Sequence, residues 1–586
     1  MNDNAQFHKI PITLGITGHR DLREGEKDIL REAVRKIFQF IQKHHPNTPL
    51  QLFSPLADGA DRLVAQVALE ENVQLIVPLP MPKDLYEIDF QTHDSKTEFD
   101  ELLEKAQEKG QVFELPLLED KEKIRSYGEA RTKQYAFVGA YIARHSHILI
   151  ALWDGLPLDK SGGTSQVVQF RLMGKMKDLP KCYQLQHGPL DIPNTGPVCH
   201  VVTSREGGEP LDLVGKIQIL LPNNQNKSHL ADLLSDNLVA LNRFNQDVEK
   251  YANHPRLQRW IKQSQRYLLP EKIGKNFENL SPAFKTMLGV YGTANALARY
   301  FQFRLRQSTL AVLWIVGAMV GFYGWYNSLE TNPIALISYL ILFLVATAIL
   351  WGSQWWHYHS KALDYRALAE SLRVQIFWHL GGLTDSVTDH HLLKQQGELT
   401  WIRNSIQAIN VYDWAENTES LAEIHSHWIK HQHEWFSKNT KKNLHKSEKF
   451  GKWINGFFVS TIALIVGLLA GQLTGIVSSH SFLHHLLILL IALVPATGAL
   501  LHYYTEIMAF DEQAKQYERM TELFMRANDE MEKIIVAQRQ NNEKTEEEYQ
   551  KQAKAVLFEL GKEALKENDN WLLLHRKRSL KLPKNS

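Results

Sequence analysis

Four stretches of the chain contain no aspartate, glutamate, lysine or arginine, and each is close to the length that a helix needs to cross a lipid bilayer. They cover residues 309–326, 333–351, 454–478 and 482–503. A spanning helix needs about 20 predominantly apolar residues for a hydrocarbon core of about 30 Å. Because the stretches come in two close pairs, we expect four transmembrane helices in two hairpins. The alternative for any one of them is a helix pair buried inside a soluble protein.

Basic residues beside these stretches predict their orientation. Arg299, Arg304 and Arg306 precede the first stretch, whereas the hairpin tips at 327–332 and 479–481 contain neither lysine nor arginine. The third stretch is preceded by a run of lysines: Lys438, Lys441, Lys442, Lys446, Lys449 and Lys452. Since lysine and arginine favour the cytoplasmic side, both tips should face outside, and the N-terminus, central segment and C-terminus should be cytoplasmic. The first residues lack the apolar core of a secretory signal. We therefore expect a multi-pass protein of the inner (plasma) membrane.

Small and polar residues within the spans suggest contacts between helices. Gly317 and Gly321 form one pair at four-residue spacing, and Gly467, Gly471 and Gly475 form a double one. Glycine at this spacing lets helices approach closely in lipid, although glycine is also simply common in membrane helices. Pro495 should kink the fourth span. Gln472 needs a partner, either another helix or water in a pore, and the absence of charged residues from all four spans predicts that any pore is weakly selective.

The segments around the two hairpins resemble each other. Aromatic and basic segments precede spans one and three, and "HYHSKALDYRALAESLRVQIFW" after span two parallels "HYYTEIMAFDEQAKQYERMTELF" after span four. We interpret this as an internal duplication of two spans followed by cytoplasmic helices. The last stretch is charged and favours helix.

Composition excludes several classes of partner. Lysine plus arginine (66) nearly balance aspartate plus glutamate (65) in the 586 residues, so nothing in the net charge points to nucleic acid. The two cysteines, Cys182 and Cys199, show no metal-ligand spacing and suit a reducing cytosol. No metal and no cofactor is expected.

Residues 10 to about 205 alternate apolar runs with helical patterns. The run "ITLGIT" is followed by a helix expected to open at Asp21, with Glu24 as its capping-box partner, and "VCHVVTSR" supplies the last expected strand. Strands that alternate with helices in this way predict an α/β, Rossmann-like domain with a parallel, doubly wound sheet.

The unusual residues of this domain follow the strands, at the edge where such sheets bind ligands. Glycines there let backbone N–H groups face an anion, and a helix N-terminus adds to the attraction. A glycine turn that only serves the fold is the alternative for each motif alone. The expected ligand-binding residues are Thr17, Gly18, His19, Arg20, Asp58, Gly59, Asp61, Asp154, Gly155, Gly162, Gly163, Thr164 and Arg205.

Four motifs, "GITGHRDL", "PLADGADRLVAQVAL", "YIARHSHILIALWDG" followed by "GGTSQVV", and "GPVCHVVTSR", resemble the SLOG superfamily over about the first 205 residues. The resemblance implies a Rossmann-like domain that binds nucleotides or nucleotide-derived signals such as ADP-ribose species. "DYRALAESLRVQIFW" and "HWIKHQHEWFS" resemble SLATT domains, paired-span effectors associated with pores in bacterial anti-phage systems, which have two spans where this chain has four.

The resemblance leaves the choice between enzyme and sensor open. LOG phosphoribohydrolases in the SLOG superfamily carry a P-G-G-x-G-T-x-x-E pattern, whereas "KSGGTSQVVQFRLMGKMK" lacks the proline, the further glycine and any acid between Thr164 and Asp178. Cleavage of a glycosidic bond needs a nearby carboxylate, which Asp154, Asp58 or Asp61 could still supply. There is no G-x-x-x-x-G-K-[ST] loop to support ATPase or GTPase chemistry. We therefore expect binding without turnover and assign no catalytic residue.

Together these features predict a cytoplasmic sensor of a nucleotide-derived signal, ADP-ribose-like or cyclic nucleotide-like, that controls an oligomeric, pore-forming membrane effector in anti-phage or stress defence. His19, Arg20 and Arg205 would contact the phosphates, and a separate enzyme would make the signal. A membrane-tethered nucleotide hydrolase and a membrane scaffold without nucleotide binding are the alternatives. The expected domains are 1–205 (sensor), 206–307 (helical linker), 308–380 (first hairpin and helix), 381–452 (cytoplasmic helices) and 453–586 (second hairpin and C-terminal helix).

Overall fold

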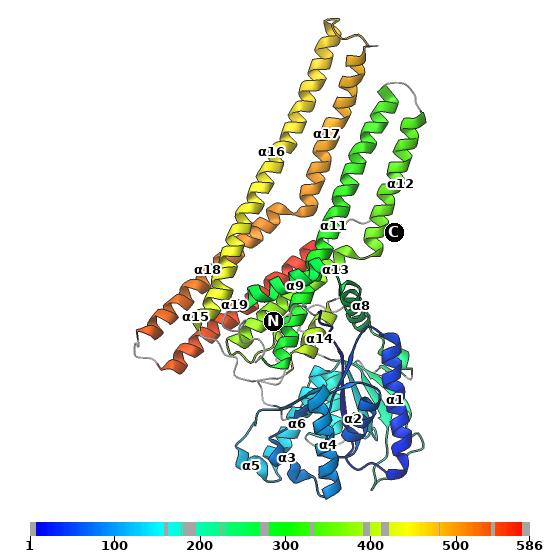
Figure 1. Ribbon diagram of the computed structural model, residues 1–586, viewed down its shortest axis with the longest axis vertical. Helices are drawn as coiled ribbons and strands as arrows, with labels where there is room; N and C mark the ends of the chain where they lie inside the picture. Colours follow the sequence, from blue (N-terminus) through cyan, green and yellow to red (C-terminus); the bar gives the residue numbers. More distant parts are fainter. Residues whose placement is uncertain are drawn as a thin grey trace. The chain divides into compact units, whose positions relative to one another are not determined.

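The computed structural model describes residues 7–157, 162–176, 179, 195–222, 225–227, 229–269, 280–328, 333–390, 399–411, 421–479, 481–540 and 545–576. The chain forms two compact units (Figure 1). Unit 1 comprises residues 1–265, 276–293 and 384–417, and unit 2 comprises 266–275, 294–383 and 418–586.

An eight-stranded sheet in the order β4-β3-β2-β1-β5-β6-β7-β8 organises unit 1. The first six strands are parallel, and β7 and β8 are antiparallel to their neighbours. The strands are β1 Ile12–Gly18, β2 Leu50–Phe53, β3 Gln74–Leu79, β4 Gln111–Glu114, β5 Ile148–Trp153, β6 Val198–Val202, β7 Ile217–Leu221 and β8 Gln225–Lys227. This confirms the α/β Rossmann-like fold, with its strand order reversing between β1 and β5.

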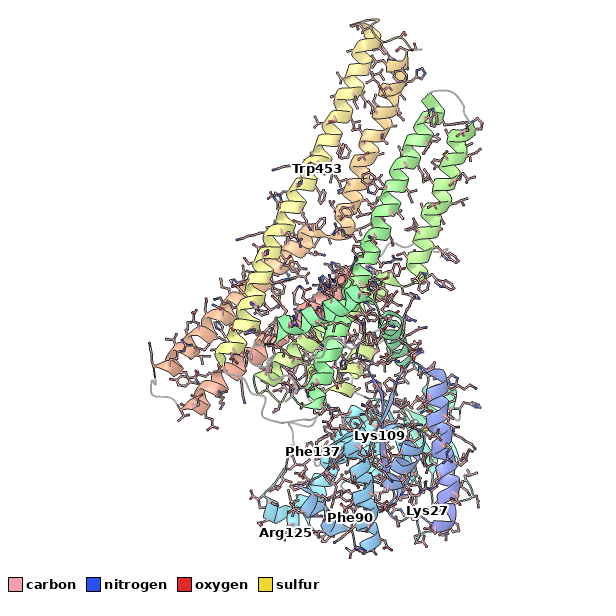
Figure 2. All side chains as sticks on the ribbon, viewed as in Figure 1. Lys27, Phe90, Lys109, Arg125, Phe137 and Trp453 are labelled. Carbon is pink, nitrogen blue, oxygen red and sulfur yellow. The ribbon has the colours of Figure 1, made fainter. Side chains whose placement is uncertain are left out.

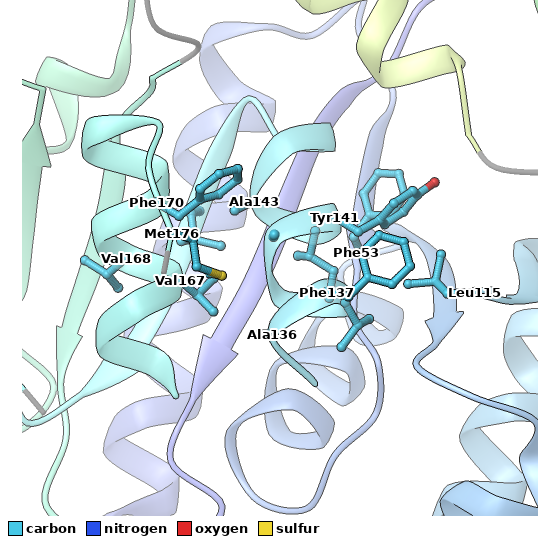
Figure 3. Packing of buried hydrophobic residues seen from close by; sticks show 14 of the residues in the cluster. Phe53, Leu115, Ala136, Phe137, Tyr141, Ala143, Val167, Val168, Phe170 and Met176 are labelled. Carbon is cyan, nitrogen blue, oxygen red and sulfur yellow. The ribbon is translucent and has the colours of Figure 1, made fainter. Parts of the chain in front are cut away.

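Helices cover both faces of this sheet, as its nearly continuous apolar strands require. They are α1 Lys27–His44, α2 Ala60–Glu70, α3 Lys83–Tyr86, α4 His93–Lys109, α5 Lys121–Arg125, α6 Glu129–His145 and α7 Thr164–Met173. Helix α6 packs into a large apolar cluster, in which Phe53 meets Tyr141 edge-on at 6.5 Å between ring centroids. Figure 3 shows Val167, Phe170 and Met176 gathered at α7 in the same cluster.

Two expectations for unit 1 were wrong. The first helix does not open at Asp21 with a capping box: a single 3-10 turn begins at Glu24, α1 begins at Lys27, and neither start has a side-chain cap. Leu22 instead forms an isolated β-bridge with Arg205, and the Asp21 carbonyl accepts from the Glu206 N–H at 2.9 Å, so this segment is tied to the chain after β6. In addition, β6 is not the last strand, since β7 and β8 extend the sheet beyond Arg205.

Segments from beyond the sheet complete unit 1. Helices α8 Asp236–Tyr251, α9 Pro255–Leu268 and α14 Thr400–Ile409 follow. The segment that lies between the two hairpins in sequence, 384–417, belongs to unit 1. Phe244 of α8 and Trp401 of α14 lie 6.2 Å apart between ring centroids. The central segment expected at 381–452 is thus divided between the two units.

The candidate membrane spans lie in four helices: α11 Pro282–Ser328, α12 Pro333–Trp355, α16 His431–Leu473 and α17 Phe482–Met508. At most 22% of the most apolar window of any of them is buried. Trp453 of α16, for example, is 52% exposed and points outward (Figure 2). Apolar surface on this scale requires an apolar solvent, so the alternative of a helix pair buried in a soluble protein does not hold.

The duplication is visible in the backbone of unit 2. In each hairpin the second span ends at one non-glycine residue in the left-handed region, His357 (φ 52°) or Ala509 (φ 50°), and a new helix follows at once. These helices are α13 Tyr358–Leu380 and α18 Phe510–Arg539. The shared break at the same point of both copies supports a repeated unit of two spans and one further helix.

The remaining helices of unit 2 are α15 Leu421–Ile424, which runs through a π-helical turn (His425–Lys430) into α16, and the last helix, α19 Glu546–Arg576. Trp378 of α13 is completely buried and donates its indole N–H to the Leu557 carbonyl of α19 at 3.1 Å. A Cβ on Gly561 would lie 2.2 Å from that indole nitrogen, so glycine is required for this contact between α13 and α19.

Candidate functional site

The carboxyl ends of β1, β5 and β6 are level, because Gly18 pairs with Leu152 and Trp153 pairs with Val202. The strand order reverses between β1 and β5, so this edge is the topological switch point at which open α/β sheets bind ligands. The expected residues at 17–20, 58–61, 154–155 and 162–164 all follow parallel strands at this edge.

The switch point itself is filled by a side chain of the protein. His19 is 4% exposed, and its Nε2 accepts a hydrogen bond from the Asp154 N–H at 3.0 Å. The Asp154 carboxylate accepts from the Arg205 Nε at 3.0 Å and from the Leu156 N–H at 3.0 Å. His19, Asp154 and Arg205 therefore join the ends of β1, β5 and β6 to one another.

The imidazole of His19 is neutral at physiological pH. Burial lowers the pKa of His19, and the nearby Arg205 adds to that effect, although Asp154 opposes it. Because Nε2 accepts a backbone hydrogen bond, the proton of the neutral ring lies on Nδ1. His19 thus accepts a backbone hydrogen bond through Nε2, and its expected contact with a phosphate stays a prediction.

Close backbone contact explains two of the glycines. A Cβ on Gly18 would lie 2.3 Å from the Ala60 Cβ, and a Cβ on Gly59 would lie 2.3 Å from the Arg20 carbonyl oxygen. Gly59 also has φ 80°, and the Ala60 N–H donates to the His19 carbonyl at 3.0 Å. These glycines allow the loop after β1 and the start of α2 to pack together, which fixes the position of Arg20.

Arg20 is the expected site residue with the most accessible charge. Its side chain is 48% exposed, whereas its Nη1 lies 3.7 Å from the buried Asp89 carboxylate. Its guanidinium lies 5.2 Å from the ring centroid of Tyr135, within cation–π range. Burial lowers the pKa of Arg20, but Tyr86, Tyr135 and Asp89 together raise it, so the group stays charged.

A buried polar cluster that the sequence reasoning missed supports Arg20. Asp89 is 2% exposed in its side chain; its Oδ1 accepts from the Nη2 of Arg131 at 2.7 Å, and its Oδ2 accepts from the Tyr135 hydroxyl. Arg131 is also buried and donates to the carbonyls of Ile124 and Leu85 at 3.0 and 2.9 Å. The only signal in the sequence is the four-residue spacing of Arg131 and Tyr135, which puts both on one face of a helix.

The two acidic residues of the "ADGAD" loop have different environments. Asp58 is partly exposed and pairs with the Arg62 Nη1 at 2.7 Å. Asp61 is buried within the first turn of α2, and burial raises its pKa to about 7, against the opposing effects of Arg20, of the Ala57 backbone and of Arg62. Each of the carboxylates that might have replaced the missing glutamate, Asp154 included, thus has partners within the protein.

The glycine turn before α7 lies beside the same cluster. Gly162 (φ 71°) packs against α6, where a Cβ would lie 2.9 Å from the Ala136 nitrogen and 3.3 Å from the Tyr135 Cβ. Gly163 is the N-cap residue, and Thr164 begins α7. The buried hydroxyl of Ser165, in the first turn, has no hydrogen-bond partner among the residues the structure describes. Tyr135 is therefore the side chain that links this turn to Arg20.

The two remaining residues expected at this edge have modest roles. Gly155 is exposed with φ 83°, which reverses the chain after β5. Thr17 is part of β1 and pairs with Ala151. The structure thus brings all the expected residues to one edge: Thr17, Gly18, His19, Arg20, Asp58, Gly59, Asp61, Asp154, Gly155, Gly162, Gly163, Thr164 and Arg205.

The glycines expected to pack the spans behave differently from one another. A Cβ on Gly317 would lie 3.7 Å from the Leu500 side chain of α17, an ordinary van der Waals distance, while Gly321 and Gly467 have no described atom within 4 Å of a Cβ position. Gly475 was wrongly assigned to a span: α16 ends at Leu473, and Gly475 (φ 73°) lies in the hairpin turn because a left-handed residue reverses the chain there. Tighter packing occurs instead at two other glycines: a Cβ on Gly324 would lie 2.5 Å from the Leu489 side chain, and a Cβ on Gly498 would lie 3.1 Å from that of Phe457.

The polar residues of the second hairpin have local roles. Gln472 hydrogen-bonds the His484 ring at 3.2 Å, so its partner is another helix. Pro495 lies inside α17, which continues as one helix from Phe482 to Met508. Gly467 and Gly471 line an open hollow of about 790 Å³ between α16 and α17, whose other walls include Leu464, Val477 and Leu487.

A comparison of the chain with models of known protein families finds no match, and a comparison with curated proteins finds none either.

Proposed function

We propose that this protein is a membrane-bound sensor in which the carboxyl edge of the unit 1 sheet binds a nucleotide-derived anion and thereby controls the four-span unit 2. The resemblance to SLOG and SLATT proteins motivates the ligand class, the oligomeric pore and a role in anti-phage or stress defence. The contacts within unit 1 support the binding site and the coupling.

The position favoured for the anion lies beside Arg20. Arg20 and Arg131 bring two guanidinium groups to the cluster, against the Asp89 carboxylate and an Asp61 that is partly protonated near pH 7. The cluster therefore has spare positive charge, and Arg20 presents it toward solvent. The N-terminus of α7 adds backbone donors on the other side of Tyr135, and the ring of Tyr127, 66% exposed, offers a stacking surface.

One observation carries the coupling: helix α6 contacts the site with its first half and the segment between the hairpins with its last turn. Arg131 and Tyr135 belong to the cluster, and two turns later Arg144 binds both oxygens of Asp389 at 2.5 and 2.6 Å. His145 hydrogen-bonds the Gln407 carbonyl at 2.9 Å. A displacement of α6 on binding would thus act on residues 384–411, which are joined to spans on both sides along the chain.

A second covalent route runs through α11. Its first residues belong to unit 1, where Ala283 lies in the apolar cluster and Thr293 accepts from the His8 N–H at 3.1 Å, and the same helix continues as the first span. A ligand can shift the state of the spans only by the difference in its affinity for the two arrangements. A difference in the affinity of the site for the ligand would act on the spans through α6 and α11.

For the membrane itself, we propose an inner-membrane location with unit 1 in the cytoplasm. The basic residues Arg299, Arg304 and Arg306 before α11's apolar stretch, together with the lysines of α16, support this orientation. Assembly of several copies would place hairpins such as α16–α17 around a shared leak, a geometry that the exposed Gly467 would permit.

Replacing Arg20 with alanine should weaken ligand binding about 10- to 100-fold, because charge-assisted hydrogen bonds contribute about 1.5–3 kcal/mol. The measurement is the thermal unfolding of the full-length protein in detergent with a panel of ADP-ribose and cyclic nucleotides. A ligand bound at 100 times its Kd should stabilise the parent by about 2.7 kcal/mol.

The matched control for this test is Arg125→Ala, which removes an exposed arginine of α5 and should leave binding unchanged. Equal affinity of the Arg20 and Arg125 variants would remove the proposed site. Failure of every nucleotide to stabilise the parent would favour a scaffold, and release of cleaved product, detected by chromatography, would favour a hydrolase.

Replacing Arg144 with alanine should separate binding from response. The variant should bind the ligand within about twofold of the parent, since Arg144 lies at the far end of α6 from the cluster, but should lose most ligand-induced dye leakage from reconstituted vesicles. Lys133→Ala, on the same helix and in an exposed pair with Glu129 at 2.8 Å, is the control and should retain leakage. Full leakage from the Arg144 variant would rule out α6 as the coupling element.

A further inference from the structure

One side of helix α9 is basic, and no acidic residue balances it within the described part of the chain. The other side is apolar: Ile261 is completely buried, and a Cβ on Gly292 of α11 would lie 3.1 Å from its side chain, so the orientation of α9 is fixed. Residues 253–269 contain no aspartate or glutamate. Three arginines lie on the exposed side and form no ion pair with a described residue: Arg256, Arg259 and Arg266.

A lipid surface is too distant along the chain to supply the missing counter-charge. Helix α9 packs on α11 at Gly292, which lies 17 residues before the first apolar stretch begins at Thr309, or about 25 Å along the helix. The headgroup layer extends only about 5–7 Å beyond the hydrocarbon core. The nearly balanced charge of the whole chain gives no reason to expect nucleic acid. The basic side of α9 therefore suits a protein surface that carries carboxylates.

Helix α4 carries such a surface. Its apolar side, with the completely buried Phe99, is fixed in the core. Asp100 on the same helix pairs with Lys83 at 2.7 Å. Three further carboxylates are exposed and form no ion pair among the residues that the structure describes: Asp94, Glu101 and Glu104. They lie on one side of α4, because residues seven and ten positions apart share a side of a helix.

The two charged sides match when the helices run antiparallel. The arginines are separated by three and then seven residues, and the carboxylates have the same separations in the reverse order, so both sets extend over about 15 Å of helix. Gln263 would lie opposite Thr97 between them. Lys105, the one basic residue beside these carboxylates, would lie opposite the uncharged Pro255. The resulting pairs are Arg256–Glu104, Arg259–Glu101 and Arg266–Asp94.

We propose that α9 of one copy docks antiparallel against α4 of a second copy of this chain through these three pairs. The contact joins two copies because both helices are fixed by their buried sides, and the six charged side chains form no ion pair within the described part of one chain. The planar guanidinium group of arginine suits recognition of a carboxylate. Because the two surfaces differ, the contact is head-to-tail, and repeated contacts can close into a ring.

The strength of this contact depends on the shared membrane. A single exposed ion pair contributes little, whereas several pairs act together when copies in one bilayer are held at high local concentration. The contact rests on the assembly of several copies proposed above. Its test needs no nucleotide, so its failure would leave the proposed ligand site untouched.

The test is cross-linking between two full-length copies that carry different tags and are expressed together. Gln263→Cys in one copy and Thr97→Cys in the other should react with a short bifunctional maleimide in isolated membranes. The parent, which keeps Cys182 and Cys199, gives the background. The matched control replaces Thr97→Cys with Gln107→Cys, an exposed position of α4 about 15 Å further along, and should give at least tenfold less product.

Charge reversal tests the pairing itself. Arg256→Glu with Arg259→Glu in the copy that carries Gln263→Cys should lower the product at least tenfold. Adding Glu101→Arg with Glu104→Arg to the other copy should restore it to within about threefold of the unreversed pair.

The control for charge reversal is Lys36→Glu with Lys43→Glu, which reverses two exposed charges of α1 and should leave the product unchanged. Equal product from the Thr97 and Gln107 positions would overturn the proposal, as would reversed charges on α4 that fail to restore the product. Loss of the product after nuclease treatment would also overturn it, by assigning the basic side of α9 to nucleic acid.

Discussion

Replacing Asp89 with alanine should lower the free energy of unfolding of unit 1 by about 3–5 kcal/mol, the usual cost of removing one partner from a buried ion pair. Among the described residues, the Asp89 carboxylate is the only acidic partner of the Arg131 guanidinium, and both side chains are at most 2% exposed. Without it, the Arg131 charge would be left with neutral acceptors in a desolvated position. The cost arises from this uncompensated charge more than from the lost contact itself.

The measurement is amide hydrogen exchange of the β1 and β5 peptides in the full-length protein in detergent, which reports the free energy of opening of unit 1 alone. Asp84→Ala is the matched control: it removes an exposed carboxylate of α3 that pairs with Lys121 at 3.1 Å, and it should leave the stability close to that of the parent because exposed ion pairs contribute little.

The double variant Asp89→Ala with Arg131→Met should recover part of the loss, because neither buried charge then remains. A single Asp89 variant within about 1 kcal/mol of the parent would show that Arg131 finds another counter-charge. Additive losses in the double variant would assign the effect to packing.

Local signals made much of the fold predictable. Strands β1 to β6 are short apolar runs bounded by glycine or polar turns, and their alternation with helices is enough to predict parallel pairing. The spans were predictable because charged side chains are costly in lipid, so each span is a stretch of the sequence without charged residues. Strands β7 and β8 were not expected, although "KIQILL" is itself an apolar run. Strands β7 and β8 pair antiparallel to their neighbours, whereas the alternation of strands with helices predicts only parallel pairing.

The site was predictable only in part, and the reason is long-range pairing. Glycines and polar residues that end strands could be assigned to one edge, since all parallel strands end there. The partners of Arg20 come from two later segments, one containing Tyr86 and Asp89 and the other Tyr135, and no spacing rule joins these segments to Arg20. His19 was expected to contact a phosphate, but its hydrogen bond from the Asp154 N–H could not be predicted, because only the register of β1 with β5 brings the two groups within 3.0 Å.

That residues 384–417 belong to unit 1 could not be predicted from local sequence patterns either. Arg144 and Asp389 are separated by 245 positions, and an exposed arginine at the end of a helix would ordinarily be assigned to solvent or to the helix dipole. The same limit applies to Asp61. An acidic residue in the first turn of a helix is a common surface feature, whereas here the turn is covered and the carboxyl group is buried.

Because the Asp61 carboxyl group is buried, replacing it should have a large effect on stability. The Asp61→Asn variant should be more stable than the parent at pH 8 by up to about 4 kcal/mol, and the two proteins should be equally stable near pH 4. Burial raises the pKa of Asp61 from 3.8 to about 7 in the folded protein. Below pH 3.8 both the folded and the unfolded chain hold the proton. Between the two values only the folded chain holds it, so stability falls as pH rises, and the full cost is present above about pH 7.

The comparison between variant and parent isolates this group from others that titrate nearby. Burial lowers the pKa of His145 to about 4 and that of His147 to about 3, so both histidines destabilise unit 1 as pH falls below 6.5, in the opposite direction to Asp61. Both are present in the parent and in the variant, and their effect cancels in the difference. Asp94→Asn, on the neighbouring α4, is the control and should keep the pH dependence of the parent because Asp61 is still present.

Hydrogen exchange of β1 and β5, corrected for the intrinsic effect of pH, measures this difference between pH 4 and pH 8. The stability of the variant relative to the parent should rise steadily between about pH 4 and pH 7 and then level off, since ionised Asp61 in the parent is desolvated while asparagine keeps a similar shape without the charge. A difference that stays constant with pH would mean that the Asp61 carboxyl is ionised throughout this range. The cluster around Arg20 would then have no spare positive charge at neutral pH. The electrostatic reason for placing an anion there would be lost.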